Sequence, residues 1–392
     1  MRTVIADDFT GAVEIGGVTA RYGLRAEIQT VFCPESDADI VVIDTDTRSL
    51  PPNEAAAKVG LAARDLKDTL FFKKVDSVLR GPVVAELSSA LQAVGKKRVL
   101  LLPANPALKR TIRNGRYYIG EIEIHRTGFA FDPEYPALSS QVDSLLGRSD
   151  GLPVSVLTLD DVMSDSGIIV GEASNQSDQN AWTSQLDQQT LAAGGSGFFE
   201  SVLGALGYKS SDSARNSLLE FDGCTLFVCG SCSDYSRQAL SDMRQSGIPV
   251  LEMPAELFEG SVNYDSAIVD WSNTVRQALH VSGIAVMAID RPPVNEPGAA
   301  QRLCRLQIDA VKSVLDNCRV DQLFVEGGST GSALIRSMGW NRLEVVDELA
   351  TGVVRVKCRG SVDTPLLTIK PGSYSWPFDV RQFGDKQLHK LS

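Results

Sequence analysis

Residues 40–102 read IVVIDTDTRSLPPNEAAAKVGLAARDLKDTLFFKKVDSVLRGPVVAELSSALQAVGKKRVLLL, and this stretch decides the fold class. Two segments within it, residues 53–67 and 83–94, have the apolar spacing of amphipathic helices. Short apolar runs flank these segments and predict buried strands at Ile40–Asp44, Leu70–Lys73 and Arg98–Leu102. Alternation of strands and helices predicts a parallel sheet that helices cover on both faces.

The same alternation continues through most of the 392 residues, a length that suggests two domains. Further strands are expected at Thr3–Ile5, Ser155–Thr158, Leu226–Cys229, Val250–Met253, Ala285–Asp290, Leu323–Glu326, Val353–Lys357 and Leu366–Ile369. The polar stretch 208–222 contains no clear strand and is the predicted boundary. We therefore predict an α/β fold with domains 1–208 and 222–392. Each has a mostly parallel sheet flanked by helices, and the active site lies in the cleft between them.

The composition restricts the functional class. Thirty-eight basic and 49 acidic residues give a formal charge of -11, which argues against a nucleic-acid partner. No apolar run approaches the roughly 18 residues of a membrane span, and the N-terminus lacks the pattern of a signal peptide. Seven cysteines and three histidines indicate neither a disulfide framework nor an all-histidine metal site. A cytoplasmic enzyme with a small-molecule substrate is expected, without nucleic-acid or membrane partners.

Polar clusters follow three strands of the first domain. The first contains the adjacent carboxylates Asp7 and Asp8, the second contains Arg48, and the third spans residues 73–81. In the third cluster the candidate residues are Lys74, Val75, Asp76, Ser77 and Arg80. One aspartate needs no explanation beyond capping a helix, and Arg48 lies in a turn-forming sequence. The clusters are expected to converge, because ligands of open α/β sheets bind at the carboxyl ends of strands. Together they predict a site for a small polyhydroxylated anion, with cations for its carboxylate and carboxylates for its hydroxyls.

Glycine-containing turns follow three strands of the second domain. Such turns let the backbone approach a phosphate, and a following helix N-terminus offers free N–H groups. The candidate phosphate-binding residues are Ser231, Gly327, Gly328, Ser329, Thr330, Lys370 and Gly372. The turns contain neither a Walker-type P-loop nor the dinucleotide-binding spacing of glycines.

Two further patterns favour other chemistry. Residues 327–331 (GGSTG) fit the nucleophile elbow of a serine hydrolase that would use Ser329, but the only histidine downstream is His389, close to the C-terminus. Cys229 and Cys232 have the C-x-x-C spacing of redox proteins. Small residues lining a glycine turn explain this pair better, since the chain is much larger than a thioredoxin domain.

Several motifs together resemble the four-carbon acid sugar kinases, which are ATP-dependent kinases of D-threonate, D-erythronate or 3-oxo-tetronate. They are IADDFTGA (residues 5–12), DTRS (46–49), KKVDSVLRG (73–81), GS (230–231), GGST (327–330) and KPG (370–372). The resemblance runs in order over nearly the whole chain. It implies that Asp8, Arg48 and residues 74–77 bind the acid, and that Ser231, residues 327–330 and Gly372 bind ATP. The DSVLRG form is closer to that of the threonate and erythronate kinases, and the family implies a possible homodimer.

The expected reaction is transfer of a phosphoryl group from ATP, with Mg²⁺, to the terminal hydroxyl of D-threonate or D-erythronate. Arg48, Lys74 and Arg80 are expected on the substrate carboxylate, with Asp7 and Ser77 beside them. Asp8 or Asp76 would accept the hydroxyl proton, and Asp8 is favoured because it opens the turn after the first strand. Three alternatives stay open. One is a 3-oxo-tetronate kinase, one is a binding or effector protein without catalysis, and the remote one is the serine hydrolase. The binding protein is kept because Ser329 stands where many members have Asp.

Overall fold

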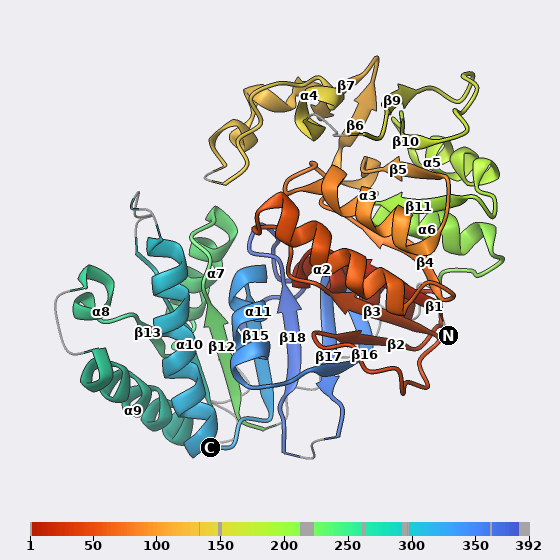
Figure 1. Cartoon of the computed structure of the whole chain (residues 1–392). Helices are drawn as coiled ribbons and strands as arrows, with labels where there is room; N and C mark the ends of the chain where they lie inside the picture. The colour runs from red at the N-terminus through yellow and green to blue at the C-terminus, as the bar shows by residue number, and fades with distance from the viewer. Residues whose placement is uncertain are drawn as a thin grey trace. The chain divides into compact units, whose positions relative to one another are not determined.

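The computed structural model of the chain divides into two compact units, residues 1–211 and 212–392 (Figure 1). The structure describes residues 2–132, 134–147, 151–211, 223–260, 264–291, 296, 298–360 and 363–383. Most of the predicted boundary stretch, at residues 212–222, lies outside the described residues, and so does His389. In the described part of the chain no helix has the length and apolarity needed to cross a membrane.

Unit 1 contains eight parallel strands in the order β2-β3-β1-β4-β11-β5-β10-β9. These strands are β1 (Arg2–Ala6), β2 (Ala26–Gln29), β3 (Ile40–Asp44), β4 (Leu70–Lys74), β5 (Arg98–Leu102), β9 (Val154–Leu157), β10 (Gly167–Gly171) and β11 (Thr190–Gly194). Its helices are α1 (Phe9–Arg21), α2 (Pro52–Asp65), α3 (Val83–Val94), α4 (Val142–Leu146), α5 (Gln176–Trp182) and α6 (Ser196–Ala205). Apart from Arg2, Phe71 and Arg98, every residue of the central strands β1, β4, β11 and β5 is buried, as expected for a parallel sheet covered on both faces.

A small antiparallel sheet is added to unit 1 between β5 and β9. It consists of β6 (Arg110–Arg113), β7 (Arg116–Ile119) and β8 (Ile122–Glu123). Short 3-10 turns flank it at Pro106–Leu108, Ile124–Arg126 and Gly128–Phe131, and a further one, Thr183–Gln185, follows α5. We call residues 105–140 the arm. The sequence analysis did not predict the arm, because its strands are only two to four residues long and its side chains are largely polar.

Unit 2 has a sheet in the order β13-β14-β12-β15-β18-β17-β16. Five of these strands are parallel, namely β12 (Thr225–Cys229), β13 (Val250–Glu252), β14 (Ile284–Ala288), β15 (Gln322–Glu326) and β18 (Leu366–Lys370). β16 (Arg342–Ala350) and β17 (Val353–Cys358) form an antiparallel pair, and β17 also pairs antiparallel with β18. The helices are α7 (Asp234–Gln245), α8 (Ala255–Glu259), α9 (Tyr264–Ser282), α10 (Ala299–Asn317) and α11 (Gly328–Ser337).

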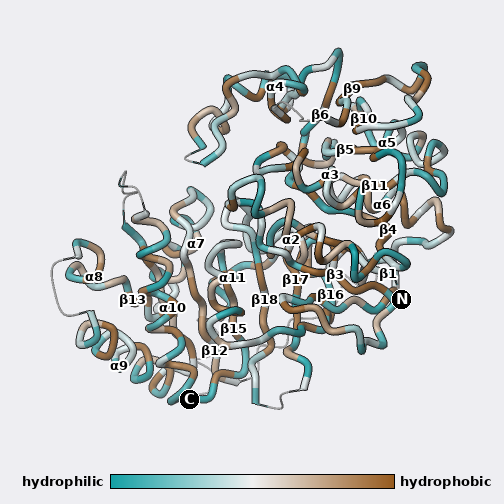
Figure 2. Tube along the Cα trace, in the orientation of Figure 1, coloured by the Kyte–Doolittle hydropathy of each residue, from teal (hydrophilic) through white to brown (hydrophobic). Residues whose placement is uncertain are grey.

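The core of unit 2 includes an aromatic cluster beside the central strands. The rings of Phe227 and Phe324 stack at 4.5 Å, and Trp376 and Phe383 pack edge-on against both. In Figure 2 the central strands of unit 2 are coloured mainly hydrophobic, whereas its helices contain both hydrophilic and hydrophobic residues. Both units therefore confirm the predicted α/β class with mostly parallel sheets.

Candidate active site

The strands of unit 1 end at a common level, which brings the polar residues after them together. In register, Asp44 of β3 lies opposite Ala6 of β1, Ala6 opposite Lys74 of β4, and Lys74 opposite Gly194 of β11. Asp7 and Asp8 therefore leave the sheet beside the loop that begins after Lys74. This loop turns sharply, since Leu79 adopts a left-handed φ of 66° that is costly for a bulky residue.

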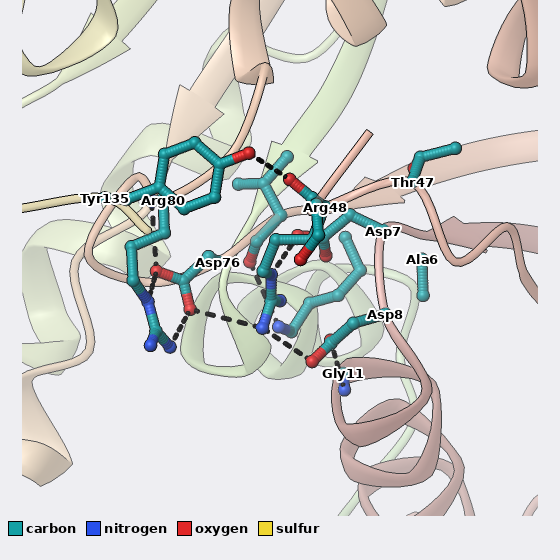
Figure 3. A network of polar contacts seen from close by, with 12 residues as sticks. Ala6, Asp7, Asp8, Gly11, Thr47, Arg48, Asp76, Arg80 and Tyr135 are labelled. Carbon is teal, nitrogen blue, oxygen red and sulfur yellow. Dashed lines mark hydrogen bonds and ion pairs between the residues drawn. The ribbon is translucent and has the colours of Figure 1, made fainter. Parts of the chain in front are cut away.

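Arg48 links the first two clusters through its guanidinium group (Figure 3). Its Nε donates to Asp7 Oδ2 at 2.8 Å and its Nη1 donates to Asp8 Oδ2 at 2.5 Å. The backbone holds the arginine in place, because the N–H groups of Thr47 and Arg48 both donate to Asp7 O. Asp8 also caps α1 by accepting from Gly11 N at 2.8 Å. Asp8 thus combines the predicted capping role with a position in the cluster.

Asp76 is held by Arg80 in a two-pronged ion pair. Arg80 Nε donates to Asp76 Oδ2 at 3.0 Å and Arg80 Nη2 donates to Asp76 Oδ1 at 2.9 Å. The backbone N–H groups of Val78 and Arg80 also donate to Asp76 Oδ2. Arg48 Nη1 lies 3.8 Å from Asp76 Oδ1, and this contact joins the third cluster to the first two (Figure 3). The structure therefore brings Asp7, Asp8, Arg48, Asp76 and Arg80 into one network, which we call the charged cluster.

The other predicted residues of unit 1 are buried around this network. Lys74 Nζ donates to Val75 O at 3.0 Å and lies 3.4 Å from Glu14 Oε2. The Val75 side chain is fully buried, so any contact that Val75 makes with a ligand would involve its backbone. Ser77 Oγ accepts from Arg110 Nη1, and Ser77 O accepts from the hydroxyl of Tyr117. These contacts connect the loop after β4 to α1 and to the arm.

The aspartates of the charged cluster differ in pKa. Burial raises the pKa of Asp7, but the charges of Arg48, Lys73 and Lys74 outweigh burial and leave it below its usual value. For Asp8, burial together with the negative charge of Asp7 outweighs Arg48 and leaves the pKa above its usual value. Asp76 is buried too, yet the charge of Arg48 and the hydrogen bonds from Arg80 hold its pKa far below the usual range. Asp8 is therefore the aspartate best suited to gain a proton during a reaction.

All three predicted cations already have carboxylate partners in unit 1. Arg48 pairs with Asp7 and Asp8, and Lys74 with Glu14. Arg80 pairs with Asp132, at 3.2 Å, in addition to Asp76. Five carboxylates thus surround three cations, so the cluster by itself holds an excess of negative charge. All three cations are therefore already engaged in ion pairs within unit 1, an arrangement that the sequence analysis did not foresee.

The glycine turns of unit 2 also start at one level of the sheet. Cys229 of β12 lies opposite Glu326 of β15, and Glu326 lies opposite Lys370 of β18. The turn after β15 is tied to both neighbours, since Gly327 N donates to Lys370 O at 2.9 Å and Gly230 N donates to Glu326 O at 3.3 Å. The predicted turns therefore lie side by side within unit 2.

Hydroxyl groups and close glycine contacts fix the shape of these turns. Gly372 O accepts from Ser231 Oγ at 3.4 Å and from Ser233 Oγ at 2.6 Å. A Cβ at Gly372 would lie 2.7 Å from Ser231 Oγ, and a Cβ at Gly230 would overlap Thr330 Oγ1. A Cβ at either glycine would therefore force the facing hydroxyl group or the turn itself to move.

Helix α11 begins directly after Gly327, which adopts a φ of 104°. Its first turn is formed by Gly328, Ser329 and Thr330 and contains no acidic side chain. Free N–H groups and the positive end of the helix dipole suit an anion such as a phosphate. Ser329 is exposed, and no histidine in the described part of the chain hydrogen-bonds to it. This geometry does not favour the serine hydrolase.

Lys370 is less available to a phosphate than its sequence position suggests. Its Nζ donates to Pro371 O at 3.1 Å and to Tyr374 O at 2.6 Å, and it lies 3.3 Å from Glu326 Oε2. Both side chains of this ion pair are almost fully buried. Burial lowers the pKa of Lys370 and raises that of Glu326. In this arrangement Lys370 holds the turn at residues 371–374 in place.

The thiols of Cys229 and Cys232 do not resemble a redox pair. Burial raises the pKa of the Cys229 thiol well above its usual value, and it also raises that of Cys232. A reactive thiol requires a lowered pKa, because the thiolate is the nucleophile. All seven cysteines are free thiols. The interpretation of Cys229 and Cys232 as small residues lining a turn agrees with this chemistry.

The family resemblance implies a Mg²⁺ ion, for which the candidate ligands are acidic side chains of the described residues. No three or more His, Cys, Asp or Glu side chains among them are placed to share a metal ion. Ser329 offers no carboxylate at the turn after β15, and Glu326 is paired with Lys370. The described part of unit 2 therefore offers no metal site built from side chains.

The sequence analysis missed several partners of the predicted residues. Glu14 projects from α1, while Asp132, Tyr135 and Arg110 come from the arm. Tyr135 donates its hydroxyl to Arg48 O at 2.6 Å. A capping aspartate followed six residues later by an acidic residue of the same helix is a weak signal for Glu14. Residues of the arm carry no local signal, because their position depends on pairing within the arm.

Two domain families match the sequence. One is described as a sugar-binding N-terminal domain and matches residues 3–202, and the other is described as a nucleotide-binding C-terminal domain and matches residues 226–374. Among curated relatives, a D-threonate kinase of Salmonella typhimurium is 26% identical, over 88% of this chain and 88% of the relative. A 3-oxo-tetronate kinase of Methylobacterium radiotolerans is also 26% identical, over 94% of this chain and 95% of its own.

Solved structures agree with the fold. A Salmonella typhimurium protein described as a putative tRNA synthase superposes with a TM-score of 0.77 at 20% identity, covering 99% of this chain and 98% of the other. A Haemophilus influenzae protein assigned to the domain family DUF1537 gives a TM-score of 0.73 at 22% identity, covering 98% and 99%. At these identities the two structures support the two-unit architecture alone.

Proposed function

The chain belongs to the four-carbon acid sugar kinase family and is a phosphotransferase that acts on a sugar-acid hydroxyl, and we propose that it transfers the terminal phosphoryl group of ATP to the 4-hydroxyl of D-threonate or D-erythronate. The observation that supports this proposal most is the charged cluster at the aligned strand ends of the unit that matches a sugar-binding domain. The aligned glycine turns of the other unit, which matches a nucleotide-binding domain, support ATP as the phosphoryl donor.

Asp8 is the proposed general base. Its side chain is 19% exposed, whereas that of Asp7 is 4% exposed, so Asp8 is the more accessible of the two. Each of its oxygens accepts one hydrogen bond from the protein, and a carboxylate oxygen has room for a second one. A raised pKa brings the group closer to the operating pH, which favours proton transfer in the transition state.

The chemical step then follows directly. The substrate hydroxyl oxygen forms a bond to the γ-phosphorus, and the bond from this phosphorus to the β–γ bridging oxygen breaks. The hydroxyl proton passes to Asp8, and ADP leaves with the bonding electrons. Catalysis of this kind depends mainly on positioning and on charge stabilisation. Asp7 and Arg48 orient Asp8, while Asp76 stays ionised and keeps Arg80 and the loop after β4 in place.

The nucleotide is assigned to the turns of unit 2. Backbone N–H groups at the start of α11 and the hydroxyls of Ser231 and Thr330 are the proposed phosphate contacts, with Gly327, Gly328, Ser329 and Gly372 providing close backbone approach. Lys370 is assigned a positioning role for the turn after β18. A Mg²⁺ ion would be held mainly by the nucleotide phosphates and water, as is common for this ion.

The relatives favour a second substrate candidate, 3-oxo-tetronate, as strongly as the first, because both groups match at 26% identity. The DSVLRG sequence of the loop after β4 supports threonate or erythronate. A reducing compartment such as the cytoplasm is the proposed location, in agreement with seven free thiols.

ADP release tests the proposal. The wild-type protein is incubated with Mg-ATP and, separately, D-threonate, D-erythronate, their L-isomers and 3-oxo-tetronate, with a control that lacks any acid. We expect turnover with one of the D-acids well above the control. A folded protein that binds ATP but releases no ADP with any of these acids would contradict the proposed reaction and favour a binding protein without catalysis. A protein that does not bind ATP would contradict the assignment of the turns.

A further inference from the structure

Arg110 is the one cation in contact with the charged cluster or its loops that has no carboxylate partner among the described residues. Its Nη1 donates to Ser77 Oγ, and the carbon of its guanidinium lies 5.6 Å from the centre of the Phe129 ring. By contrast, Arg48, Lys74 and Arg80 are each paired with carboxylates of the same unit. The charge that a substrate carboxylate needs is therefore available at Arg110.

We propose that Arg110 binds the carboxylate of the sugar acid and so makes the enzyme selective for acids over uncharged analogues. This inference rests on the proposed function and deepens it. A guanidinium presents five donors in a planar fork, and the hydrogen bond to Ser77 uses one of them. The remaining donors suit a carboxylate, which arginine binds through two parallel hydrogen bonds. The Phe129 ring lies within cation–π distance of the guanidinium.

The arm fixes the position of Arg110 at the carboxyl ends of the strands. Arg110 N donates to Asn105 O at 3.0 Å, and Asn105 N donates to Arg110 O at 2.9 Å. Asn105 follows β5 by three residues, and its side chain donates to Ser196 Oγ at 3.3 Å. The hydroxyl of Tyr117, on the neighbouring strand β7, donates to Ser77 O. Arg110 is thus held against the loop after β4 by contacts on both sides.

Binding of the carboxylate by Arg110 would fix the orientation of the substrate in the site. The carboxylate end of the acid lies at Arg110 and Ser77, and the terminal hydroxyl lies at Asp8. This arrangement gives the substrate carboxylate a cation without a carboxylate partner among the described residues, whereas Arg48, Lys74 and Arg80 are already paired. It also explains why a cluster with excess negative charge can belong to an enzyme for an acidic substrate. In this arrangement the negative charge of Asp8 serves the hydroxyl end of the substrate, and the positive charge of Arg110 serves its carboxylate end.

The test compares the preferred acid with its neutral carboxamide in wild type, Arg110→Gln and Arg110→Lys. We expect Arg110→Gln to lower kcat/KM for the acid about 10- to 100-fold, mainly through KM, because a hydrogen-bonded charge contact is lost. The kcat/KM for the carboxamide should change less than about threefold, within the range of a lost neutral contact. Arg110→Lys, which keeps the charge but not the fork, should fall between wild type and Arg110→Gln.

Arg113→Gln is the matched control. Arg113 lies on the same strand, stacks on Tyr118 and pairs with the exposed Glu121, so its loss should leave the preference for the acid unchanged. Calorimetric titration of the acid without nucleotide gives a second readout, in which Arg110→Gln should bind it at least about tenfold more weakly.

The outcomes separate this inference from the proposed function. Turnover by wild type together with an unchanged ratio of acid to carboxamide in Arg110→Gln would overturn the role of Arg110 and leave the kinase standing. Equal loss of both activities in Arg110→Gln and in Ser77→Ala would also overturn it, because it would indicate a purely structural link. Absence of turnover and of acid binding in wild type would overturn the proposed function and this inference with it.

Discussion

The candidate sites of the two units consist of different chemical groups. In unit 1 the charged cluster consists of buried ion pairs between side chains, such as Asp8 with Arg48 and Asp76 with Arg80. In unit 2 the turns consist of glycine backbone and hydroxyl groups, and the buried pair of Glu326 and Lys370 lies beneath them. The first kind of site can change its protonation and can accept a proton. The second kind offers fixed donors that suit a phosphate, which needs no proton transfer from the protein.

Replacement of the proposed base, Asp8, is expected to have the largest effect on activity. Asp8→Asn keeps a capping side chain for α1 but cannot take up the proton. We expect kcat to fall about 10²- to 10⁴-fold, the usual range for loss of a general base, with ATP affinity unchanged. Steady-state kinetics and calorimetry measure the two quantities.

The control for this change is Asp161→Asn, an exposed aspartate that accepts hydrogen bonds from Thr158 in a surface turn of unit 1. Its kcat should equal that of wild type. Wild-type turnover by Asp8→Asn would remove Asp8 from the mechanism.

Asp76→Asn tests whether the second aspartate is structural. It leaves Arg80 without its main partner and should lower the free energy of unfolding by about 3 kcal/mol, as expected for a broken buried ion pair. Urea unfolding measures the change. Asp37→Asn, in an exposed pair with Arg25, should cost only about 0–1 kcal/mol. An Asp76→Asn protein of wild-type stability would show that the pair does not hold the loop.

Gly230→Ala tests the turns of unit 2 without touching unit 1. The added methyl group would overlap Thr330 Oγ1, so the Thr330 side chain or the turn must shift. We expect the Kd for ATP to rise about tenfold or more, a loss of roughly 1.4 kcal/mol, while binding of the sugar acid is unchanged. Gly204→Ala is the control, since a Cβ there meets nothing within 4 Å. A larger loss of acid binding than of ATP binding would reverse the assignment of the two units.

The pH dependence of kcat and of stability should distinguish Asp8 from Asp76. Since burial and Asp7 raise the pKa of Asp8, kcat should fall as the pH drops through a value above that of an ordinary carboxylate. The same shift means that protonation of Asp8 favours the folded state as the pH falls through the raised pKa. Asp76 has a lowered pKa, so its contribution to stability is present above the unfolded value and is lost in strong acid. A pH–rate profile whose acidic limb lies at or below an ordinary carboxylate value would contradict the role of Asp8.

Ser329→Ala should have the smallest effect. The proposed contact at this position uses the backbone of the first turn of α11, and the side chain is exposed. We expect kcat/KM to change by less than about threefold, as for most exposed positions. Loss of all activity would instead indicate a direct role for the Ser329 hydroxyl and bring the hydrolase back into consideration.

Most of the sheet strands, and the polar residues after them, could be predicted from the sequence because both depend on local patterns. Predicted Ile40–Asp44 and Arg98–Leu102 coincide with β3 and β5, and predicted Val83–Val94 coincides with α3. Four sheet strands were not predicted: β2, β10 and β11, which are short and fully buried, and β16, which has nine residues. The predicted strand at Ser155–Thr158 is shifted by one residue in β9.

The ion pairs could not be predicted because they join residues far apart in sequence. Arg80 and Asp132 are separated by 52 residues, and Arg48 and Asp8 by 40. Nothing in the local sequence distinguishes Lys74, which is paired with Glu14, from a cation available to a ligand. For the same reason the sequence did not identify Arg110, at the start of a four-residue strand of the arm, as a candidate binding residue.

The position of the transferred phosphoryl group tests the central claim most directly. The product formed from wild-type enzyme, ATP and the preferred four-carbon acid is examined by phosphorus NMR with proton coupling. The account predicts a phosphorus coupled to both protons of the terminal carbon, as in a 4-phosphate. Coupling to a single proton would place the phosphate on a secondary hydroxyl and contradict the proposed direction of the substrate. Release of inorganic phosphate alone would contradict phosphoryl transfer to the acid.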